Sequence, residues 1–386
     1  MTVPHLIEAG LPDMIAWRRA FHRLPELAYE EHRTAATVVA LLRRFGVDEI
    51  ATGIGGTGVV AVIRNGDGPR VALRADMDAL PIAEAGTPPW RSEVAGKMHA
   101  CGHDGHMTML LGAARYLAAT RHFAGTVVLV FQPAEEGRAG AKAMIDDGLI
   151  ARFPFDRVFA LHNIPGMPAA EIAAYPGAVM AAVDRFAITV TGTGGHAAMP
   201  HLNRDPVLAG SALVMALQSI VSRSQDPRHP AVVAVTRFNA GEADNATPGS
   251  ARLLGNVRFL ERDGSALFSE RIGRIARGIA ETYGVEVAVD YVVGRPATVN
   301  AEAEAALARE AAASLGPPVT VAANQPPIMA SEDFSYFLAA RPGAFAFLGA
   351  GEGRPSLHSP DFDFNDAILV PGASFLARLA ERALLG

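Results

Sequence analysis

The feature that most constrains the fold is a change in the order of strands and helices part-way along the chain. In the first half, short apolar stretches alternate with amphipathic helical ones, and strands are predicted at residues 58–63, 70–74, 126–131 and 157–161. This alternation is typical of an α/β domain with a largely parallel sheet. Between residues 184 and 293 the order becomes strand, helix, strand, strand, helix, strand, which is that of a ferredoxin-like unit.

The α/β order resumes after residue 293, with a helix from about Ala301, a strand at 344–348 and a last helix from Asp366. The sequence therefore predicts a discontinuous α/β domain, residues 1–183 and 294–386, with an inserted α+β domain, residues 184–293. Asp205 and Pro206 support the first helix of the insert, because Asp caps free backbone N–H groups and Pro suits the first helical position.

Charge and composition exclude several classes of partner. The formal net charge is -6 and the 34 Lys and Arg residues are dispersed, so nucleic acid is not an expected partner. Polar residues interrupt the apolar stretches every few positions, so no membrane span is predicted. The N-terminal residues lack the cationic start and apolar run of a secretory signal, and we therefore expect a cytoplasmic protein. The single cysteine, Cys101, can form no disulfide within the chain.

Acidic residues and histidines follow the ends of four predicted strands, at one edge of the expected sheet. They are Asp76 and Asp78, Glu135 and Glu136, His162, and His358. In open α/β sheets, ligands collect beyond the carboxyl ends of the strands. Each residue alone has an ordinary explanation, such as a turn cap, a solvated charge or a histidine bonded to backbone. Their predicted convergence at one edge of the sheet favours a metal site.

The segment MHACGHDGH, residues 98–106, is the strongest local signal. Cys101 and His103 stand two apart in a Gly-containing loop before a helix predicted at 107–119, so both can face one centre. A helix N-terminus lowers the pKa of a thiol and favours the thiolate that binds metal. A buried, inert cysteine is the alternative. Three histidines within eight residues favour metal binding over it.

The types of donor indicate the metal and the chemistry. Imidazoles, carboxylates and one thiolate suit zinc or manganese, and an acid next in sequence to a ligand is well placed to act on water. Glu135 would be that acid and Glu136 the ligand. The sequence contains no G-x-x-x-x-G-K-[ST] motif, and the glycines of residues 53–56 lack the dinucleotide fingerprint, so phosphate binding is not supported.

These motifs, in order along nearly the whole chain, resemble the amidohydrolase branch of the aminoacylase and carboxypeptidase G metallopeptidase family. That branch includes hippurate hydrolase, N-acetyl-amino-acid and N-acetyldiaminopimelate deacetylases, and auxin-conjugate hydrolases. The matching segments are FHRLPEL (21–27), LRADMDALP (73–81), MHACGHDGH (98–106), FQPAEEG (131–137), LHN (161–163), GHAAMPH (195–201), SEDF (331–334) and LHSP (357–360). The resemblance implies a zinc-exopeptidase-like catalytic domain, largely parallel in its sheet, that carries a ferredoxin-like lid.

The resemblance also implies two divalent metal ions per subunit, zinc or manganese, with cobalt or nickel also compatible. Cys101 would bridge the two ions, His103 and His162 would complete one site, and Glu136 and His358 would complete the other. Glu135 matches the general base of the family. Asp78 matches a carboxylate that orients a ligand, and His103 takes the duty that falls to a histidine at the position of Asp76 in other branches.

For the inserted domain the resemblance implies a lid that also forms a homodimer, with a tetramer as the alternative. His196 and Asn245 would contact the tetrahedral intermediate, and Arg258 would hold the substrate carboxylate. A second imidazole, His201, could take the role of His196. Two residues of this lid depart from the family pattern, Asn203 and Thr247, where relatives more often have Gly and a β-branched aliphatic residue.

The expected activity is metal-dependent hydrolysis of the amide bond of small N-acetyl or N-benzoyl amino acids, which releases a carboxylate and the free amino acid. A metallo-dipeptidase or carboxypeptidase is the alternative with the same chemistry. Thiol catalysis, with Cys101 as nucleophile and His103 as base, is a rival within enzymes. A noncatalytic binding protein on the same fold is a rival from another class, and the presence of Glu135 argues against it.

Overall fold

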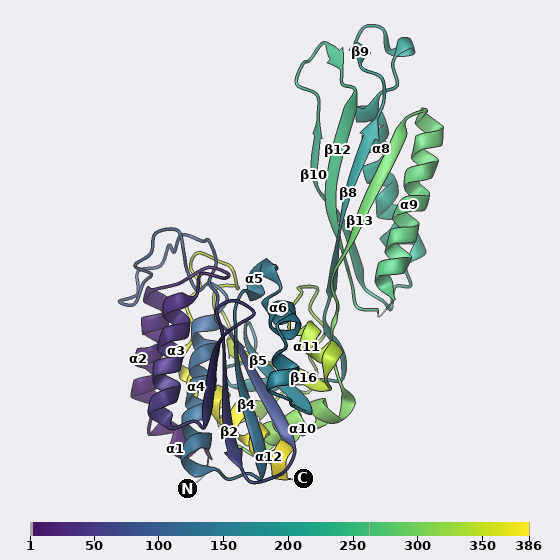
Figure 1. The fold of residues 1–386 in the computed structure, drawn as a ribbon. Coiled ribbons are helices and arrows are strands. Elements are labelled where there is room, and N and C mark those ends of the chain that lie inside the picture. Colours follow the sequence, from purple (N-terminus) through teal and green to yellow (C-terminus); the bar gives the residue numbers. More distant parts are fainter. Residues whose placement is uncertain (1–2, 262, 386) are drawn as a thin grey trace. The chain divides into compact units, whose positions relative to one another are not determined.

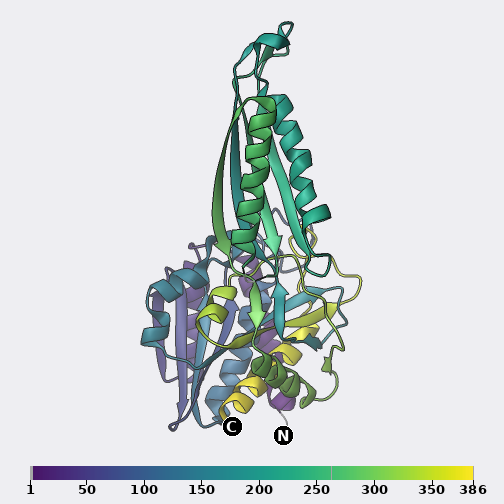
Figure 2. The ribbon, with the colours of Figure 1, turned by 90° about the vertical axis from the view of Figure 1, so that its right-hand side faces the viewer.

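The computed structural model describes residues 3–261 and 263–385, and the chain forms two compact units (Figures 1 and 2). Unit 1 comprises Met1–Val179, Val299–Pro326 and Asp333–Gly386. Unit 2 comprises Met180–Thr298 and Pro327–Glu332. Unit 2 is thus wider than the predicted insert of residues 184–293, and nothing in the sequence indicated that its second segment belongs to it.

Unit 1 contains an eight-stranded sheet in the order β1–β2–β4–β3–β5–β16–β6–β15. The strands are β1 (Glu49–Ile54), β2 (Gly58–Asn65), β3 (Arg70–Asp76), β4 (Gly125–Gln132), β5 (Arg157–Pro165), β6 (Glu171–Ala173), β15 (Thr320–Val321) and β16 (Gly343–Gly351). The four central strands, β4, β3, β5 and β16, are mutually parallel. Strand β2 pairs antiparallel with both β1 and β4, and β6 pairs antiparallel with β16.

The predicted α/β class and mostly parallel sheet are therefore confirmed. The strand predicted at 58–63 nevertheless runs antiparallel to its neighbours, which its composition could not show. The central strands are continuous runs of buried apolar residues, such as Val127–Phe131 within β4, because helices cover both faces of the sheet.

Helices of unit 1 pack on both faces of this sheet (Figure 1). One face is covered by α4 (His103–Thr120) and α12 (Leu369–Leu385), with α1 (Val3–Glu8), α2 (Leu11–Arg23), α3 (His32–Phe45) and α10 (Glu302–Ala313) packed around them. The other face carries α6 (Gly140–Asp146), α7 (Leu149–Arg152) and α11 (Ser335–Ala340). Nearly every side chain of α4 is buried, so the first turns of this helix lie deep in unit 1.

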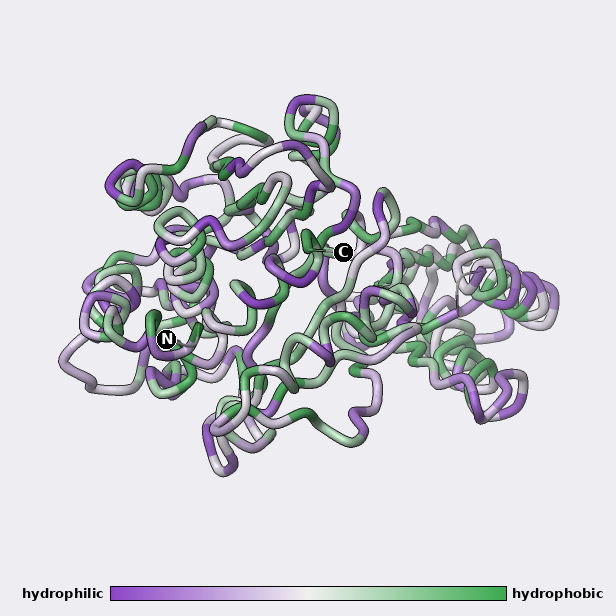
Figure 3. Tube along the Cα trace, turned by 90° about the horizontal axis from the view of Figure 1, so that it is seen from below, coloured by the Kyte–Doolittle hydropathy of each residue, from purple (hydrophilic) through white to green (hydrophobic). Residues whose placement is uncertain are grey.

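Unit 2 has the predicted β-α-β-β-α-β order and a four-stranded antiparallel sheet in the order β10–β12–β8–β13. Its elements are β8 (Ala182–Thr191), α8 (Pro206–Ser219), β10 (Ala231–Ala240), β12 (Ser250–Phe259), α9 (Gly264–Tyr283) and β13 (Glu286–Arg295). Buried and exposed residues alternate along β8, and α8 and α9 cover one face of the sheet (Figure 2). Hydrophobic and hydrophilic residues are interleaved along the helices (Figure 3).

Helix α8 begins as predicted, because the side chain of Asp205 accepts hydrogen bonds from the backbone N–H groups of Val207 and Leu208, at 2.8 and 3.2 Å. Together with the following turn, η2 (Ile220–Ser224), helix α8 is long and apolar enough to cross a membrane. This finding rests on length and composition alone, and a single such helix is weak evidence for a membrane span. One side of α8 packs on the sheet of its unit through Leu213 and Leu217.

Short elements complete the chain. Strands β7 (Gly177–Met180) and β14 (Thr298–Asn300) lie at the two main boundaries between the units. Strands β9 (Gly195–His196) and β11 (Ala246–Thr247) form a small ladder beyond the end of β8, next to η1 (Pro200–Leu202). Helix α5 is assigned to Glu135–Arg138, and η3 (Asp366–Ile368) precedes α12.

Candidate active site

The carboxyl ends of three parallel strands, β4, β5 and β16, and the start of α4 bring five predicted residues together in unit 1. Ligand atoms of Cys101, His103 and His162 lie within 4.8 Å of one another, and so do those of Cys101, Glu136 and His358. Cys101 belongs to both groups. The structure therefore forms two triads of metal-binding side chains that share one sulfur atom, in the same division as the two ligand sets implied by the resemblance.

Hydrogen bonds orient the two buried histidines so that one nitrogen of each faces the cluster. The Nδ1–H of His103 donates to the backbone carbonyl of Asp78 at 2.8 Å, and the Nδ1–H of His162 donates to the carbonyl of Asn163 at 2.8 Å. The Nε2 atom of His162 is then left 3.5 Å from the Cys101 sulfur. Metal-bound histidines are held in this way, with the second nitrogen bonded to a carbonyl or carboxylate.

The second triad, Cys101, Glu136 and His358, is less buried than the first. The Nε2 atom of His358 lies 3.3 Å from Oε1 of Glu136, and its side chain is 53% exposed. His358 has a φ of 63°, in the left-handed region that a residue with a side chain rarely adopts. Its backbone N–H donates to the carbonyl of Ala100 at 2.8 Å, which ties this loop to the residue before Cys101.

The environment of Cys101 differs from the sequence prediction. Helix α4 begins at His103 and not at residue 107, so His103 lies in its first turn and Gly102, with φ of 89°, precedes it. A Cβ atom at Gly102 would collide with Oδ1 of Asn163, and the positive φ also disfavours a side chain, so glycine is favoured there. Burial and the charge of Glu136 raise the pKa of the Cys101 thiol well above its usual range, which contradicts the expected lowering by the helix.

These features fit a bound cation. Nε2 of His103, a buried atom of the cluster, has no hydrogen-bond partner among the residues that the structure describes, and Oε1 of Glu136, also buried, lies 3.3 Å from Nε2 of His358. Burial also lowers the pKa of His162 well below its usual range, which leaves its imidazole neutral, as a ligand must be. A buried thiol, imidazoles and a carboxylate are a donor set that suits a divalent metal ion.

The general base predicted from sequence, Glu135, lies beside this cluster. It is 6% exposed, and its ligand atom lies within 4.8 Å of those of His103 and Glu136. Asp78 is fully buried and connects two parts of the cluster. One of its carboxylate oxygens accepts a hydrogen bond from the Glu136 backbone N–H at 2.8 Å, and the other lies 3.3 Å from Nδ1 of His103.

Asp76 does not belong to either triad that contains Cys101. Its Oδ1 lies 2.7 Å from Nδ1 of His106, and its Oδ2 accepts a hydrogen bond from Arg74 at 2.7 Å. Burial alone would raise the pKa of Asp76, but His103 and Arg74 hold it well below its usual range. A third group of donors, Asp76, His103 and His106, also converges. Both ring nitrogens of His106 are already hydrogen-bonded, the second to Oδ1 of Asn163 at 2.6 Å.

The predicted lid residues lie at two different ends of the unit 2 sheet. His196 is exposed on β9, where the Ala197 N–H donates to the backbone carbonyl of Asn245 at 3.0 Å. Arg258 is half-buried near the end of β12, opposite Val183, and donates to the Met329 carbonyl at 2.9 Å. The structure thus brings His196 and Asn245 together and keeps Arg258 apart from them.

The two lid residues that depart from the family pattern contact each other. The amide of Asn203 donates to the hydroxyl of Thr247 at 3.3 Å and to the carbonyl of His196 at 3.2 Å. The pair therefore supports the loop that carries His196. The alternative imidazole, His201, is exposed on η1, five residues further along the chain.

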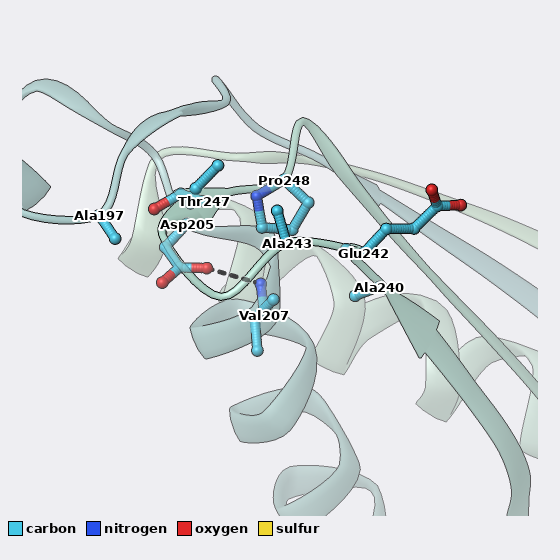
Figure 4. Close-up of a pocket in the computed structure, with 10 residues that line it drawn as sticks. Ala197, Asp205, Val207, Ala240, Glu242, Ala243, Thr247 and Pro248 are labelled. Carbon is cyan, nitrogen blue, oxygen red and sulfur yellow. Dashed lines mark hydrogen bonds between the residues drawn. The ribbon is translucent and has the colours of Figure 1, made fainter.

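A cavity of about 460 Å³ lies near β9 and β11 in unit 2 (Figure 4). It is lined by Ala197, Asp205, Val207, Ala240, Gly241, Glu242, Ala243, Ala246, Thr247 and Pro248. None of the predicted site residues lines it, although Ala197 and Ala246 are neighbours of His196 and Asn245 in sequence. The donors that could hold a metal lie in unit 1.

Comparison with known proteins identifies the family. Residues 72–382 match the model of peptidase family M20/M25/M40. The chain belongs to this family. It is 43% identical to hippurate hydrolase of Campylobacter jejuni over 95% of each chain. It is 38% identical to N-acetyl-L-cysteine deacetylase of Bacillus subtilis, over 96% of this chain and 88% of the relative.

Two solved structures share the fold over nearly the whole length of the chain. A putative aminohydrolase from methicillin-resistant Staphylococcus aureus superimposes with a TM-score of 0.92 at 31% identity, over 100% of this chain and 99% of the other. A dinuclear metal-binding M20 peptidase from Bacillus subtilis gives a TM-score of 0.86 at 34% identity, over 98% and 99%. The α/β catalytic domain and lid expected for this family are thereby confirmed.

Several residues around this M20 site were not found from the sequence. They are Glu31, which binds the Ala134 N–H, Arg74 and His106, which bind Asp76, and Asn163, whose carbonyl accepts from His162. The contacts of Glu31 and His106 join residues 103 and 30 positions apart, so no spacing rule points to them. For His106 a signal existed, since it is the third histidine of the segment 98–106.

Proposed function

We propose that this protein is a metal-dependent amidohydrolase that hydrolyses N-acyl amino acids, such as N-acetyl or N-benzoyl amino acids, to a carboxylate and the free amino acid. The observation that carries the proposal is the pair of triads that share Cys101 beside a buried glutamate, Glu135. The relatives named hippurate hydrolase and N-acetyl-L-cysteine deacetylase support this class of substrate.

In this proposal the triads hold two divalent cations, zinc or manganese. The ligands are Cys101, His103, Glu136, His162 and His358, with the Cys101 thiolate shared. Such a pair of cations supplies Lewis-acid chemistry, which activates water and polarises the amide carbonyl. A cation also favours the thiolate at a buried position whose surroundings otherwise raise the thiol pKa.

Glu135 carries the proton in this reaction. Its carboxylate accepts a proton from the attacking water and then donates it to the nitrogen of the leaving amino acid. Asp78 keeps the neighbouring ligand in place, because it accepts the Glu136 N–H and also lies against His103. These two carboxylates therefore have separate duties, proton transfer for Glu135 and orientation for Asp78.

The rival thiol mechanism is disfavoured by the same site. A nucleophilic cysteine needs a lowered pKa and some exposure, whereas Cys101 is 7% exposed and its pKa is raised by burial. Glu135 disfavours a purely binding function, since two ligand triads need no buried acid next to Glu136. A dipeptidase or carboxypeptidase would use the same catalytic groups. Only a comparison of the substrates that the protein cleaves can distinguish such an activity from the proposed one.

We also propose a homodimer in which the lid of one chain serves the site of the other. Arg258 pairs with Val183 and lies near one end of β8, whereas β8 ends at Thr191, before His196. Eight residues of strand at ~3.3 Å each separate these ends by about 26 Å, more than the length of a small N-acyl amino acid. The lid of one chain therefore cannot place both Arg258 and His196 on the same substrate. In a homodimer, one chain can supply Arg258 and the other can supply His196.

The surface of unit 2 supports a second copy as the partner. Leu208 and Met215 on α8 are 56% and 74% exposed, and they stand seven residues apart, on one face of the helix. Strand β10 is an edge strand of its sheet. Edge strands and exposed apolar helix faces are commonly covered by a symmetric partner.

A hydrolysis screen tests the proposed activity. Protein reconstituted with zinc or manganese is assayed for amino acid release from N-acetyl amino acids, N-benzoyl amino acids and dipeptides, with and without a chelator. We expect N-acyl amino acids to be cleaved and the chelator to abolish the reaction. Activity that survives complete metal removal would refute the metal mechanism, and preference for dipeptides would assign a peptidase instead.

A further inference from the structure

The loop that carries Glu135 and Glu136 has an irregular backbone. Although α5 is assigned there, Glu136 has a ψ of 77° and Gly137 a φ of 78°, neither of which is helical. Ala134 and Ala139, on either side, have φ values of 55° and 56°. A residue with a side chain rarely adopts this left-handed conformation unless the surroundings impose it.

Carboxylates from three distant segments bind the backbone N–H groups of this loop. Glu31 accepts from Ala134 at 2.9 Å, Asp78 from Glu136 at 2.8 Å and Asp333 from Ala141 at 3.0 Å. The phenol of Tyr29 donates to the Arg138 carbonyl at 3.0 Å. We call this arrangement, made by Tyr29, Glu31, Asp78 and Asp333, the loop clamp. These bonds hold a segment whose backbone departs from helical geometry at Glu136 and Gly137.

Glu31 binds the amide directly before Glu135, and Asp78 binds the amide directly after it. We propose that Glu31 is a positioning residue for Glu135: by holding the Ala134 N–H it fixes the backbone turn from which the Glu135 carboxylate projects. This inference rests on the proposed function, since it assumes that Glu135 transfers the proton. Among the described residues, the carboxylate of Glu31 bonds Ala134 and Thr57, neither of which is a donor of the two triads.

The position of Glu31 in its own helix supports this assignment. Glu31 occupies the N-cap position of α3, where Ser, Thr, Asp and Asn are preferred, and its side chain makes no capping bond. The cap is supplied by Glu26, whose two oxygens accept from the N–H groups of Arg33 and Thr34 at 3.2 and 2.9 Å. The carboxylate of Glu31 binds Ala134 and the hydroxyl of Thr57 instead.

Burial also distinguishes Glu31 from a surface acid. Glu31 is 0% exposed, and burial raises the pKa of its carboxyl. Burying such a group is unfavourable unless hydrogen bonds compensate for the lost solvent. One of these bonds comes from Thr57, and the other comes from Ala134, in a loop 103 residues away in sequence. An apolar side chain would suit this core position better if Glu31 served only to fill it.

Matched variants test the proposal. Glu31→Leu removes both acceptors, Glu31→Gln keeps an acceptor for Ala134, and Glu26→Leu removes only the cap of α3. We expect Glu31→Leu to lower kcat by on the order of ten- to a hundredfold, as when a reacting group is misplaced by about 1 Å. KM and bound metal should stay unchanged. Glu31→Gln should recover most of kcat, and Glu26→Leu should lower Tm while leaving kcat per metal-loaded site unchanged.

Amide hydrogen exchange gives a second readout that does not depend on activity. In Glu31→Leu the peptide that covers residues 134–141 should exchange faster than in wild type, and in Glu26→Leu it should not. If Glu31→Leu does not fold, Thr57→Val can replace it, because this variant removes the hydroxyl bonded to the Glu31 carboxylate. It should show the same decrease in kcat and the same faster exchange of residues 134–141, both smaller in magnitude.

Three results would overturn the positioning role: wild-type kcat in Glu31→Leu, unchanged exchange of the loop, or an equal kcat loss in Glu26→Leu. A wild-type protein that cleaves no N-acyl amino acid would refute the proposed function alone. In that case exchange of the loop still decides whether Glu31 holds it.

Discussion

Mixing two inactive variants tests whether the lid of one chain completes the active site of another. His196→Ala removes the imidazole predicted to meet the tetrahedral intermediate, and Glu135→Gln removes the base. In a single chain, Arg258 and His196 lie toward opposite ends of the unit 2 sheet, separated by about 26 Å of strand. If Arg258 holds the carboxylate of a substrate, the imidazole at that substrate must come from the partner.

The expected size of the recovered activity follows from the two-fold symmetry of a dimer. After equal mixing and free exchange, half of the dimers are hybrids. In each hybrid one site combines an intact Glu135 with an intact His196 from the other chain, while the second site lacks both. About one quarter of all sites are therefore intact, and turnover should recover to about one quarter of the wild-type value.

The assay measures amino acid release after subunit exchange in mild denaturant, with the hybrid fraction verified by native mass spectrometry. The control mixes Glu135→Gln with the double variant Glu135→Gln and His196→Ala, which can form no intact site. Activity near one quarter of wild type, absent from the control, is expected. If verified hybrids show only the residual activity of the parents, His196 acts within its own chain or not at all, and the shared-site reasoning is refuted.

Four further predictions concern single positions. Cys101→Ser should lose metal and most turnover, because a hydroxyl is a far poorer ligand than a thiolate, and elemental analysis of the variant checks this. Glu135→Gln should keep its metal and lose on the order of a hundredfold in kcat; loss of metal would mean that it is a ligand. Arg258→Ala should reduce kcat/KM on N-acyl amino acids far more than on the matching amides, because a guanidinium binds a carboxylate with two hydrogen bonds, and equal losses would contradict this. Burial alone would lower the pKa of His22, but hydrogen bonds to Asp104 and Glu84 raise it from 6.5 to about 9. Its protonated form therefore stabilises the folded metal-free protein by about 3 kcal/mol below pH 6.5, and this contribution is lost as the pH rises through 9, so urea unfolding of wild type and His22→Gln should converge at high pH.

Much of the fold could be predicted from the periodicity of apolar residues and from residues that begin or end helices and strands. The β-α-β-β-α-β order of unit 2 and its Asp205 cap were predicted, because alternating burial and a capping residue leave local patterns. The antiparallel direction of β2 was not, since a buried strand has the same composition in either direction. The segment Pro327–Glu332 was also missed, because it joins unit 2 through contacts with residues far away in sequence.

The start of α4 shows why a local pattern can mislead. Glycine is a poor helix former, so residues 98–106 with their two glycines predicted a loop. In the structure Asp104 is buried and bonded to His22 at 2.8 Å, and the His106 N–H bonds to the Gly102 carbonyl at 3.0 Å. These contacts impose the first turn.

The metal-ligand side chains could be predicted because they follow the ends of strands that meet at one edge of the sheet. Glu31 of the loop clamp could not be predicted in this way, because its contact with Ala134 joins residues far apart in sequence.

The contribution of Pro327–Glu332 to unit 2 has a consequence for protein engineering. The Ala181 N–H donates to the Ala330 carbonyl at 2.9 Å, and Arg258 donates to the Met329 carbonyl at 2.9 Å. A fragment cut at residues 180 and 298 would lose both bonds and leave the guanidinium without this carbonyl. A chimera that exchanges lids between two relatives must therefore transplant both pieces of chain, or Arg258, the proposed anchor for the substrate, will lack the carbonyl that it binds in this protein.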